Sequence, residues 1–196
     1  MGRPPRHDVD GLLDAAAELA AASGPGNVTM TAVARLAGAP SGSVYHRFPN
    51  RPALLAALWL RALDRFHEGF LVAIDAADAH AAAEAGARHI VAWCRENPLD
   101  AAILLYGSAD FEESHWPQEQ QQRLRRANRR AMHGVRDLTR RLGLDDSRGR
   151  ELVTMVVLDL PYSAVRRHLR SGTPIPRYAE DLAAESAGTV LRNHTG

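Results

Sequence analysis

The chain has 196 residues, of which 45% are hydrophobic, and a formal net charge of +1 at pH 7. This composition is ordinary for a globular protein of one or two domains, and so nearly neutral a chain gives no bulk-charge signal for nucleic-acid binding. The single cysteine, Cys94, excludes an internal disulfide and fits a reducing cytoplasm, where we expect the protein to act. The longest apolar run, over residues 152–165, contains Asp159 and Pro161 and is too short to span a bilayer.

The first predicted element is an amphipathic helix that follows a short basic tail. Residues 1–7 contain Arg3 and Arg6, and they are either an unstructured terminus or an arm that touches phosphates or the minor groove. Asp8 is a suitable N-cap, and the glycine-rich turn over residues 24–26 ends the helix. The apolar face of this helix is expected to consist of Val9, Leu12, Leu13, Ala16, Leu19 and Ala20.

Two short helices joined by a tight turn are predicted next. Thr29 can cap the first of them, and Gly38 suits its C-terminal end. The residues expected on its inner face are Val33, Leu36 and Ala37, and those expected on its outer face are Thr31 and Arg35. The second helix is predicted over residues 43–48, with Val44 and Phe48 directed inward. Two helices of this length with a glycine-containing connection form a helix-turn-helix.

Charge is unevenly distributed around this motif. Between residues 29 and 51 the chain contains Arg35, Arg47 and Arg51 but no acidic residue. A locally positive face on a nearly neutral molecule suits contact with phosphate groups.

The residues of this region resemble the DNA-binding domain of the TetR/AcrR family of transcriptional regulators. The resemblance covers about residues 8–58 and is carried by Thr29, Val33-Ala34, Ala37-Gly38, Gly42-Ser43, Val44, Tyr45, His46-Arg47, Phe48, Pro49-Asn50, Arg51 and Leu54-Leu55. The chain departs from the family pattern at Pro40-Ser41, where Ser-Lys is common, at Ala20, where an aromatic residue is common, and at Arg51, which replaces a lysine.

The resemblance implies sequence-specific DNA binding through the two short helices. The residues expected at the DNA are Thr29, Thr31, Arg35, Ser41, Gly42, Ser43, Val44, Tyr45, His46, Arg47 and Arg51. Val44 can touch a thymine methyl group only if it is not buried, and Arg51 keeps the charge of a lysine while adding a planar fork of donors. The alternative for Tyr45 is simple packing with an exposed hydroxyl group.

The remainder of the chain predicts further helices and no strand. We expect them over residues 51–71, 76–97, 98–106, 118–142, 147–170 and 178–192, with a loop over residues 107–117 and a kink at Pro161. The arginine-rich helix over residues 118–142 is either a second nucleic-acid surface or, as its apolar stripe favours, a solvated outer face.

A small apolar pocket with a few polar groups is expected in this second part. The candidate lining residues are Trp93, Tyr106, Phe111, Trp116, Met132, Met155, Asp159 and Tyr162, each of which is alternatively a core residue. Asp159 stands out because an acid within an apolar run needs a partner if it is buried. The sequence has no zinc-ligand spacing, no phosphate-binding loop and no catalytic constellation, so we expect no metal, no cofactor and no enzymatic activity.

The sequence therefore predicts an all-α protein with a DNA-binding domain over residues 1–50, which includes the basic tail, and a ligand-binding and dimerisation domain over residues 51–196. We expect a homodimer that represses transcription from a palindromic operator and is released by a small molecule. The expected dimer interface consists of Leu182, Ala183, Ser186, Ala187, Val190 and Leu191. The alternatives are a regulator that responds to a partner protein or to dosage and a helical binding protein or enzyme that retains the motif.

Overall fold

The computed structural model describes residues 9–195, and every regular element within that range is a helix, as the all-α prediction requires. Asp8, the predicted N-cap, and the basic tail over residues 1–7 lie outside the described residues. None of the described helices is long and apolar enough to cross a membrane.

The chain divides into two compact units. Unit 1 comprises the described residues up to 63 together with residues 99–125, and unit 2 comprises residues 64–98 together with those from 126 onward. Two long helices, α4 (Arg51–Ile74) and α7 (Gln118–Arg141), contribute residues to both units. The domain boundary predicted after residue 50 stays a prediction, because compactness does not show which part of a chain folds alone.

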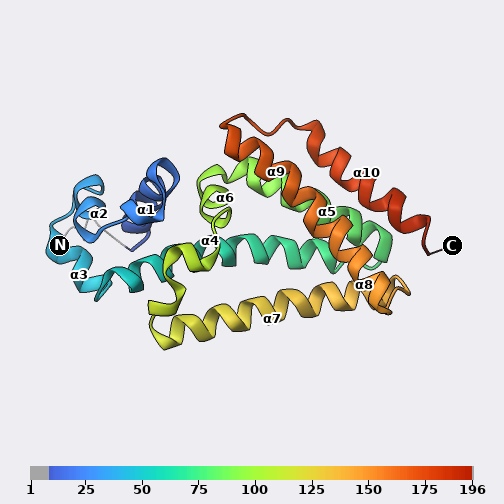
Figure 1. The fold of residues 1–196 in the computed structure, drawn as a ribbon, viewed down its shortest axis with the longest axis horizontal. Coiled ribbons are helices and arrows are strands. Elements are labelled where there is room, and N and C mark those ends of the chain that lie inside the picture. Colours follow the sequence, from blue (N-terminus) through green and yellow to red (C-terminus); the bar gives the residue numbers. More distant parts are fainter. Residues whose placement is uncertain (1–8, 196) are drawn as a thin grey trace, which may run out of the picture. The chain divides into compact units, whose positions relative to one another are not determined.

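Unit 1 contains the short helices of the predicted helix-turn-helix (Figure 1). Its complete helices are α1 (Val9–Ser23), α2 (Met30–Leu36), α3 (Ser41–Arg47) and α6 (Pro98–Leu104). α1 buries Leu12, Leu13 and Ala16 as predicted, whereas Val9, in the first turn, is exposed. The guanidinium of Arg61 on α4 lies 2.8 Å from the carboxylate of Asp14, and this ion pair helps to hold α1 against α4.

The inner face of α2 differs from the prediction. Leu36 is 47% exposed, and the buried side chains are those of Met30, Val33 and Ala34. These three residues are spaced by three and four positions, whereas Leu36 lies two positions beyond Ala34 and therefore on the opposite side of the helix. The expectation that Leu36 packs inward was wrong.

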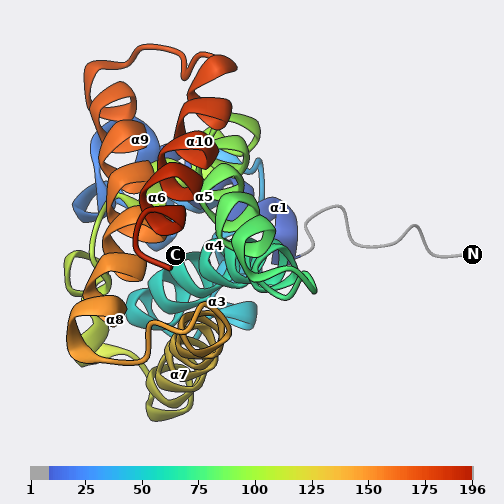
Figure 2. The same ribbon diagram turned by 90° about the vertical axis from the view of Figure 1, so that its right-hand side faces the viewer.

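Unit 2 is built around the packing of α10 on α5. Its complete helices are α5 (Ala79–Glu96), α8 (Ser147–Thr154), α9 (Leu160–Ser171) and α10 (Tyr178–Arg192). α10 runs along α5 and buries Ala184, Ala187, Gly188 and Leu191 (Figures 1 and 2). The ion pairs Arg95–Glu180 and Arg192–Glu84, each 2.6 Å long, fix the register of the two helices.

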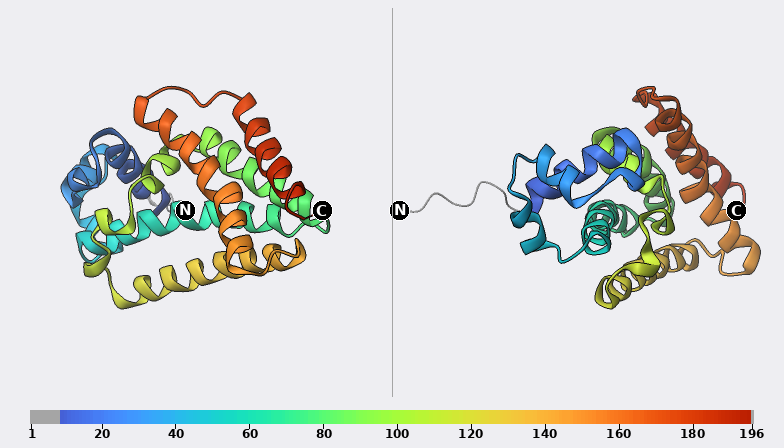
Figure 3. Two further views of the ribbon diagram at one scale, coloured as in Figure 1. Left: turned by 45° about the vertical axis from the view of Figure 1, so that its right-hand side comes forward. Right: turned by 60° about the vertical axis from the view of Figure 1, so that its left-hand side comes forward.

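One turn of π-helix, Met155–Asp159, joins α8 to α9, and α9 then crosses α5 (Figure 3). The N–H of Leu160 bonds to the carbonyl of Met155, five residues back. Pro161 explains this widening, because its ring lacks an N–H and would clash with the carbonyl four residues earlier in a regular α-helix. Where the sequence predicted a kink at Pro161, the structure has a π turn that ends two residues before it.

Gly86 allows α5 to approach the π turn closely. A Cβ atom at Gly86 would lie 2.7 Å from Cγ2 of Ile74 and 3.2 Å from Cγ1 of Val157. Since Ile74 and Val157 are buried, neither can move away without disturbing the core of unit 2.

Candidate nucleic-acid interface and ligand pocket

The two helices of the motif have well-defined ends. The side chain of Thr29 accepts a hydrogen bond of 3.1 Å from the N–H of Ala32, which confirms the predicted cap of α2. Gly38, which follows the C-cap Ala37 of α2, adopts a φ of 63°, a conformation that residues with side chains rarely adopt. Asn50 caps α4 by accepting a hydrogen bond of 2.9 Å from Ala53. These caps fix where α3 starts and stops between its neighbours.

α3 begins at Ser41, two residues earlier than predicted, and it presents a polar face. The exposed residues of α3 are Ser41, Gly42, Tyr45 and His46, and the half-buried ones are Ser43 and Arg47. Val44 is fully buried, so the condition set for its contact with a thymine methyl group is not met. Val44 and Phe48 instead form the inner face of α3, as the spacing of four residues indicates.

α2 exposes the side chains expected on its outer face, Thr31 and Arg35. Arg35, together with Arg47 near the end of α3, gives the motif two guanidinium groups for which no ion pair is found among the described residues. Such charges can meet a phosphate backbone without first breaking an internal contact.

Arg51 is positioned differently from the other two arginines. Its Nε donates to the carbonyl of Val28 at 2.6 Å, and its Nη2 donates to the carbonyls of Pro25 at 2.8 Å and Gly26 at 3.4 Å. Its Nη1 pairs with the carboxylate of Glu112. An arginine has five N–H donors, so these four hydrogen bonds leave one donor for a phosphate. We call this set of contacts the Arg51 clamp.

Glu112 itself has an unusual backbone. It adopts a φ of 61° and a ψ of 40°, between the two short 3-10 turns Ser108–Phe111 and Glu113–His115. A residue other than glycine, asparagine or aspartate in this left-handed region costs about 1 kcal/mol or more. This conformation lets the chain reverse between the turns while the Glu112 side chain reaches Arg51.

Three of the predicted pocket residues form an aromatic cluster in unit 1. Phe111 and Trp116 are buried, and the indole N–H of Trp116 donates to the carbonyl of Phe111 at 2.7 Å. Tyr106 packs edge-on against Phe111, with ring centroids 6.2 Å apart, and Trp116 lies 6.0 Å from Trp59. These contacts give all three residues a packing role.

A cavity of about 380 Å³ lies within unit 2, in the size range of small-molecule pockets. Its walls come from α4, α7 and the π turn, and the lining residues are Phe66, His67, Phe70, Asn128, Ala131, Met132, Val135 and Leu158. Phe66 and Phe70 stack with ring centroids 5.7 Å apart and planes inclined by 15°. Phe66 also meets Trp93 edge-on at 5.3 Å. We call this cavity the α4–α7 pocket.

His67 is the polar group buried in the wall of the α4–α7 pocket. The residue is only 6% exposed, and its Nδ1 atom has no hydrogen-bond partner. Burial lowers the pKa of His67 below its usual 6.5, Asp64 opposes this effect and Arg130 adds to it. The imidazole is therefore neutral at pH 7. A buried ring nitrogen without a partner is unusual, because such groups are normally hydrogen-bonded.

The other predicted pocket residues are placed as follows. Met132 lines the α4–α7 pocket, whereas Trp93 does not line it but contacts the lining residue Phe66 edge-on. Met155, Asp159 and Tyr162 are exposed. The exposed carboxylate of Asp159 needs no buried partner, so the inference drawn from an acid inside an apolar run does not apply. The sequence missed His67, although a lone histidine between two phenylalanines on one helix was a visible signal.

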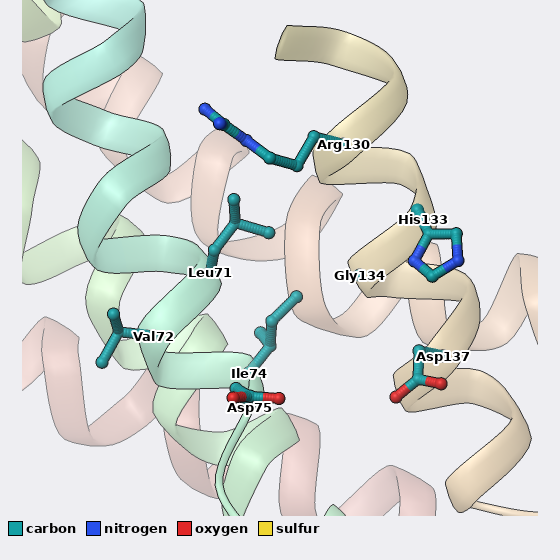
Figure 4. Close-up of a pocket in the computed structure, with 8 residues that line it drawn as sticks. All are labelled: Leu71, Val72, Ile74, Asp75, Arg130, His133, Gly134 and Asp137. Atoms are coloured by element: carbon teal, nitrogen blue, oxygen red, sulfur yellow. The ribbon is translucent and has the colours of Figure 1, made fainter. Parts of the chain in front are cut away.

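A second groove, of about 340 Å³, lies between the later parts of α4 and α7 and is more polar (Figure 4). Leu71 and Ile74 extend toward α7, and Arg130, His133 and Asp137 project from α7 around the opening. Among the described residues, no group of three histidine, cysteine or acidic side chains lies close enough to hold a metal ion.

Cys94 is buried in α5. Burial raises the pKa of its thiol to about 12, so the thiolate is scarce at pH 7. Cys94 is therefore a small, unreactive core residue.

The residues predicted for a dimer interface fall into two groups. Ala187 and Leu191 are fully buried within a single chain against α5, so they have no exposed surface to lose to a partner, and their assignment was wrong. Leu182 and Ser186 are exposed, and the half-buried members of the set are Ala183 and Val190. Tyr178, which the prediction omitted from the interface, is 65% exposed on the same helix.

Comparison with known proteins agrees with this architecture. Residues 12–58 match the family described as "Bacterial regulatory proteins, tetR family". No curated protein matches the chain. Among solved structures, the chain is similar to the TetR family transcriptional regulator PfmR from Thermus thermophilus, at 19% identity and a TM-score of 0.73, over 95% of this chain and 96% of that one.

Two further solved structures have the same fold. The fatty acid degradation regulator FadR from Bacillus halodurans shares 14% identity at a TM-score of 0.70, over 97% of each chain. FadR from Bacillus subtilis, solved in complex with stearoyl-CoA, shares 15% identity at a TM-score of 0.64, over 92% of this chain and 98% of that one. Residues 12–58 thus match the tetR family of bacterial regulatory proteins, and the chain shares the fold of these solved regulators over nearly its whole length.

Proposed function

We propose that this chain is a DNA-binding transcriptional regulator, a repressor that dissociates from its operator when a small molecule occupies the α4–α7 pocket. The observation that carries this proposal is the polar face of α3, which is held rigidly by buried Val44 and Phe48 and lies within the family-matched segment. A recognition helix reads bases from its N-terminal part, and here that part exposes Ser41 and Gly42.

The DNA-facing residues divide into two roles. Arg35 and Arg47, with Thr31, are suited to phosphates, which set affinity but not sequence preference. The remaining contacts to base edges are assigned to Ser41, Gly42, Ser43, Tyr45 and His46. We assign Arg51 a positioning role, since most of its donors already bind the loop before α2.

Two copies of the chain are required by this proposal. One short helix covers only part of a groove, so specific affinity needs two half-sites, about 34–36 Å apart for reading heads separated by one helical turn. Tyr178 and Leu182 are exposed apolar residues four positions apart on α10, and Leu160 is exposed at the start of α9. We assign these residues to the dimer interface.

Ligand control is supported by the position of the pocket on α4. Phe66, His67 and Phe70 line it, and the same helix begins with the Arg51 clamp. A ligand that shifts α4 can therefore alter DNA binding without touching DNA. A molecule that binds the DNA-incompetent state about 100-fold better supplies roughly 2.7 kcal/mol, within the usual range of coupling energies. A regulator without an effector would not need this cavity, which favours ligand control over control by a partner protein.

Selection of the full-length protein on random duplexes tests the proposal. The expected product is an inverted repeat that matches the two-fold symmetry of a dimer. Recovery of unrelated or asymmetric sequences would count against it.

Gly42 offers a matched pair of control variants. A Cβ atom there would meet no atom within 4 Å and Gly42 is exposed, so we expect both Gly42→Ala and Gly42→Glu to keep the fold. Only Gly42→Glu places a carboxylate on the DNA-facing side of α3, and we expect it to abolish selection. Equal binding by both variants would move the DNA interface away from α3.

A further inference from the structure

We infer that the effector of the α4–α7 pocket is a compact aromatic molecule with one uncharged hydrogen-bonding group, which pairs with Nδ1 of His67. This inference rests on the proposed function only for the role of the molecule as an effector. The kind of molecule that binds is argued from the residues that line the pocket.

The pocket wall favours an aromatic body. Phe66 and Phe70 present two nearly parallel rings, and Met132 supplies a polarisable thioether opposite α4. Aromatic faces and sulfur both interact favourably with a further ring, beyond the effect of burying apolar area. At about 380 Å³ the cavity is near the lower end of the range for small-molecule sites, so the ligand is compact.

The lining also selects against charge. The eight lining residues include no arginine, lysine, aspartate or glutamate, so an ionised ligand group enclosed by them would lose its hydration without gaining a counter-charge from the lining. Arg130 and Asp64, whose charges act on His67, lie outside this lining and are of opposite sign. The pocket therefore differs from a site for an acyl-CoA, whose phosphates would need basic partners.

His67 supplies the buried polar contact, because Asn128, the other polar lining residue, is exposed. Its Nδ1 is buried and unpaired, and the ring is neutral because burial, with a smaller contribution from Arg130, lowers its pKa more than Asp64 raises it. A neutral imidazole can donate from one nitrogen and accept at the other. A ligand hydroxyl or carbonyl group can therefore form the hydrogen bond that Nδ1 lacks, with the ring in the tautomer that suits it. Leaving a buried polar atom unpaired is costly, and that cost disappears when the ligand is bound.

Three probes that share the naphthalene ring system test this inference on the full-length protein. Naphthalene has no polar group, 2-naphthol adds a neutral hydroxyl group, and 2-naphthoate carries a charge at pH 7. We expect 2-naphthol to bind about 3- to 10-fold more tightly than naphthalene in equilibrium dialysis, which corresponds to one hydrogen bond. We expect 2-naphthoate to bind more weakly than either. Tightest binding by 2-naphthoate, or equal binding of all three probes, would overturn the inference.

Variants at three positions locate the contact. His67→Phe keeps a ring of similar size and should bind naphthalene and 2-naphthol equally, whereas His67→Asn keeps a polar atom near Nδ1 and should retain the preference. Leu158→Trp fills the cavity and should weaken all three probes. His133→Phe is the matched control, because His133 is exposed on α7 and does not line this pocket. A preference for 2-naphthol that survives His67→Phe would show that another group makes the contact.

A second measurement separates this inference from the proposed function. Binding of the selected operator is measured with and without 2-naphthol. If 2-naphthol binds through His67 but leaves operator affinity unchanged, the pocket chemistry stands and ligand control fails. If no probe binds while operator binding is intact, the inference on the pocket fails and DNA binding stands.

Discussion

Arg51 and Glu112 form an ion pair across a sequence separation of 61 residues, within unit 1. Through it, the loop between α6 and α7 is tied to the first residue of α4 and, by the other donors of Arg51, to the carbonyls of Pro25 and Val28 that precede α2. One guanidinium therefore holds three separate segments of chain around the helix-turn-helix.

This arrangement predicts that Arg51 acts through stability. Arg51→Ala should lower the free energy of unfolding by about 1.5–3 kcal/mol, the range for hydrogen bonds to a charged group, as measured by urea denaturation. Arg51→Lys is the informative control, because a lysine keeps the charge but cannot reproduce the planar fork. If the Arg51→Lys variant were as stable as the unchanged protein, the charge of Arg51 alone, and not its planar fork, would account for the stabilisation.

Glu112→Gln should have a smaller effect than Arg51→Ala. The Glu112 side chain is 40% exposed, so solvent screens the pair, and we expect a loss of less than about 1 kcal/mol. The double variant measures the coupling between the two residues directly. A coupling energy indistinguishable from zero would mean that Arg51 is held by the carbonyls alone.

Arg47 predicts the opposite behaviour. Arg47→Ala should leave the unfolding midpoint unchanged, weaken binding to every duplex alike, and reduce the slope of log affinity against log salt by about one unit. Titration of labelled duplexes at several salt concentrations gives the slope. A change in sequence preference without a change in slope would instead place Arg47 at a base edge.

Two substitutions on α10 distinguish a dimer contact from a core contact. Leu182 is 54% exposed and Ala187 is fully buried against α5. Leu182→Arg should yield a folded monomer with weakened operator binding, whereas Ala187→Arg should unfold unit 2, because it strands a large charge inside a packed helix pair. Sedimentation velocity and circular dichroism separate the two outcomes. A Leu182→Arg variant that remains dimeric would place the interface on another surface.

The histidines of unit 2 predict loss of stability in acid. Burial lowers the pKa of both His67 and His89 below 6.5 in the folded state, and His89 is partly compensated by its contact with the Phe66 carbonyl. Well above pH 6.5 both rings are neutral in the folded and in the unfolded chain, so they add no pH dependence there. Below pH 6.5 the unfolded chain binds protons that the folded chain does not, so stability falls until the folded pKa values are reached. Urea midpoints should decrease from pH 7 to pH 5, and less so in His67→Phe.

The sequence predicted most of the helices because their signals are local. Thr29, Gly38 and Asn50 mark helix ends through contacts within four residues, and the structure places all three at such ends. The resemblance to the TetR/AcrR family over residues 8–58 is also confirmed by the family comparison for residues 12–58.

Contacts between distant segments could not be predicted in the same way. A guanidinium at position 51 looks the same in sequence whether it meets a phosphate or the carbonyl of Val28, and only the fold decides. Likewise, the apolar stripe of α10 predicted burial of Leu191 but not whether α5 or a second subunit would cover it. The pocket was missed at His67 because the absence of a partner for one ring nitrogen is a property of the surrounding structure.

The π turn at Met155–Asp159 has a consequence for relatives of different length. A π turn holds one more residue than the α-helical turn it replaces, so removal of one residue there restores regular geometry and preserves the faces of α8 and α9. Elsewhere in α8 or α9 the same deletion would rotate all later side chains by about 100°. A homologue that lacks one residue in this stretch should therefore also lack Pro161. In a sequence alignment, its one-residue gap should be placed within Met155–Asp159.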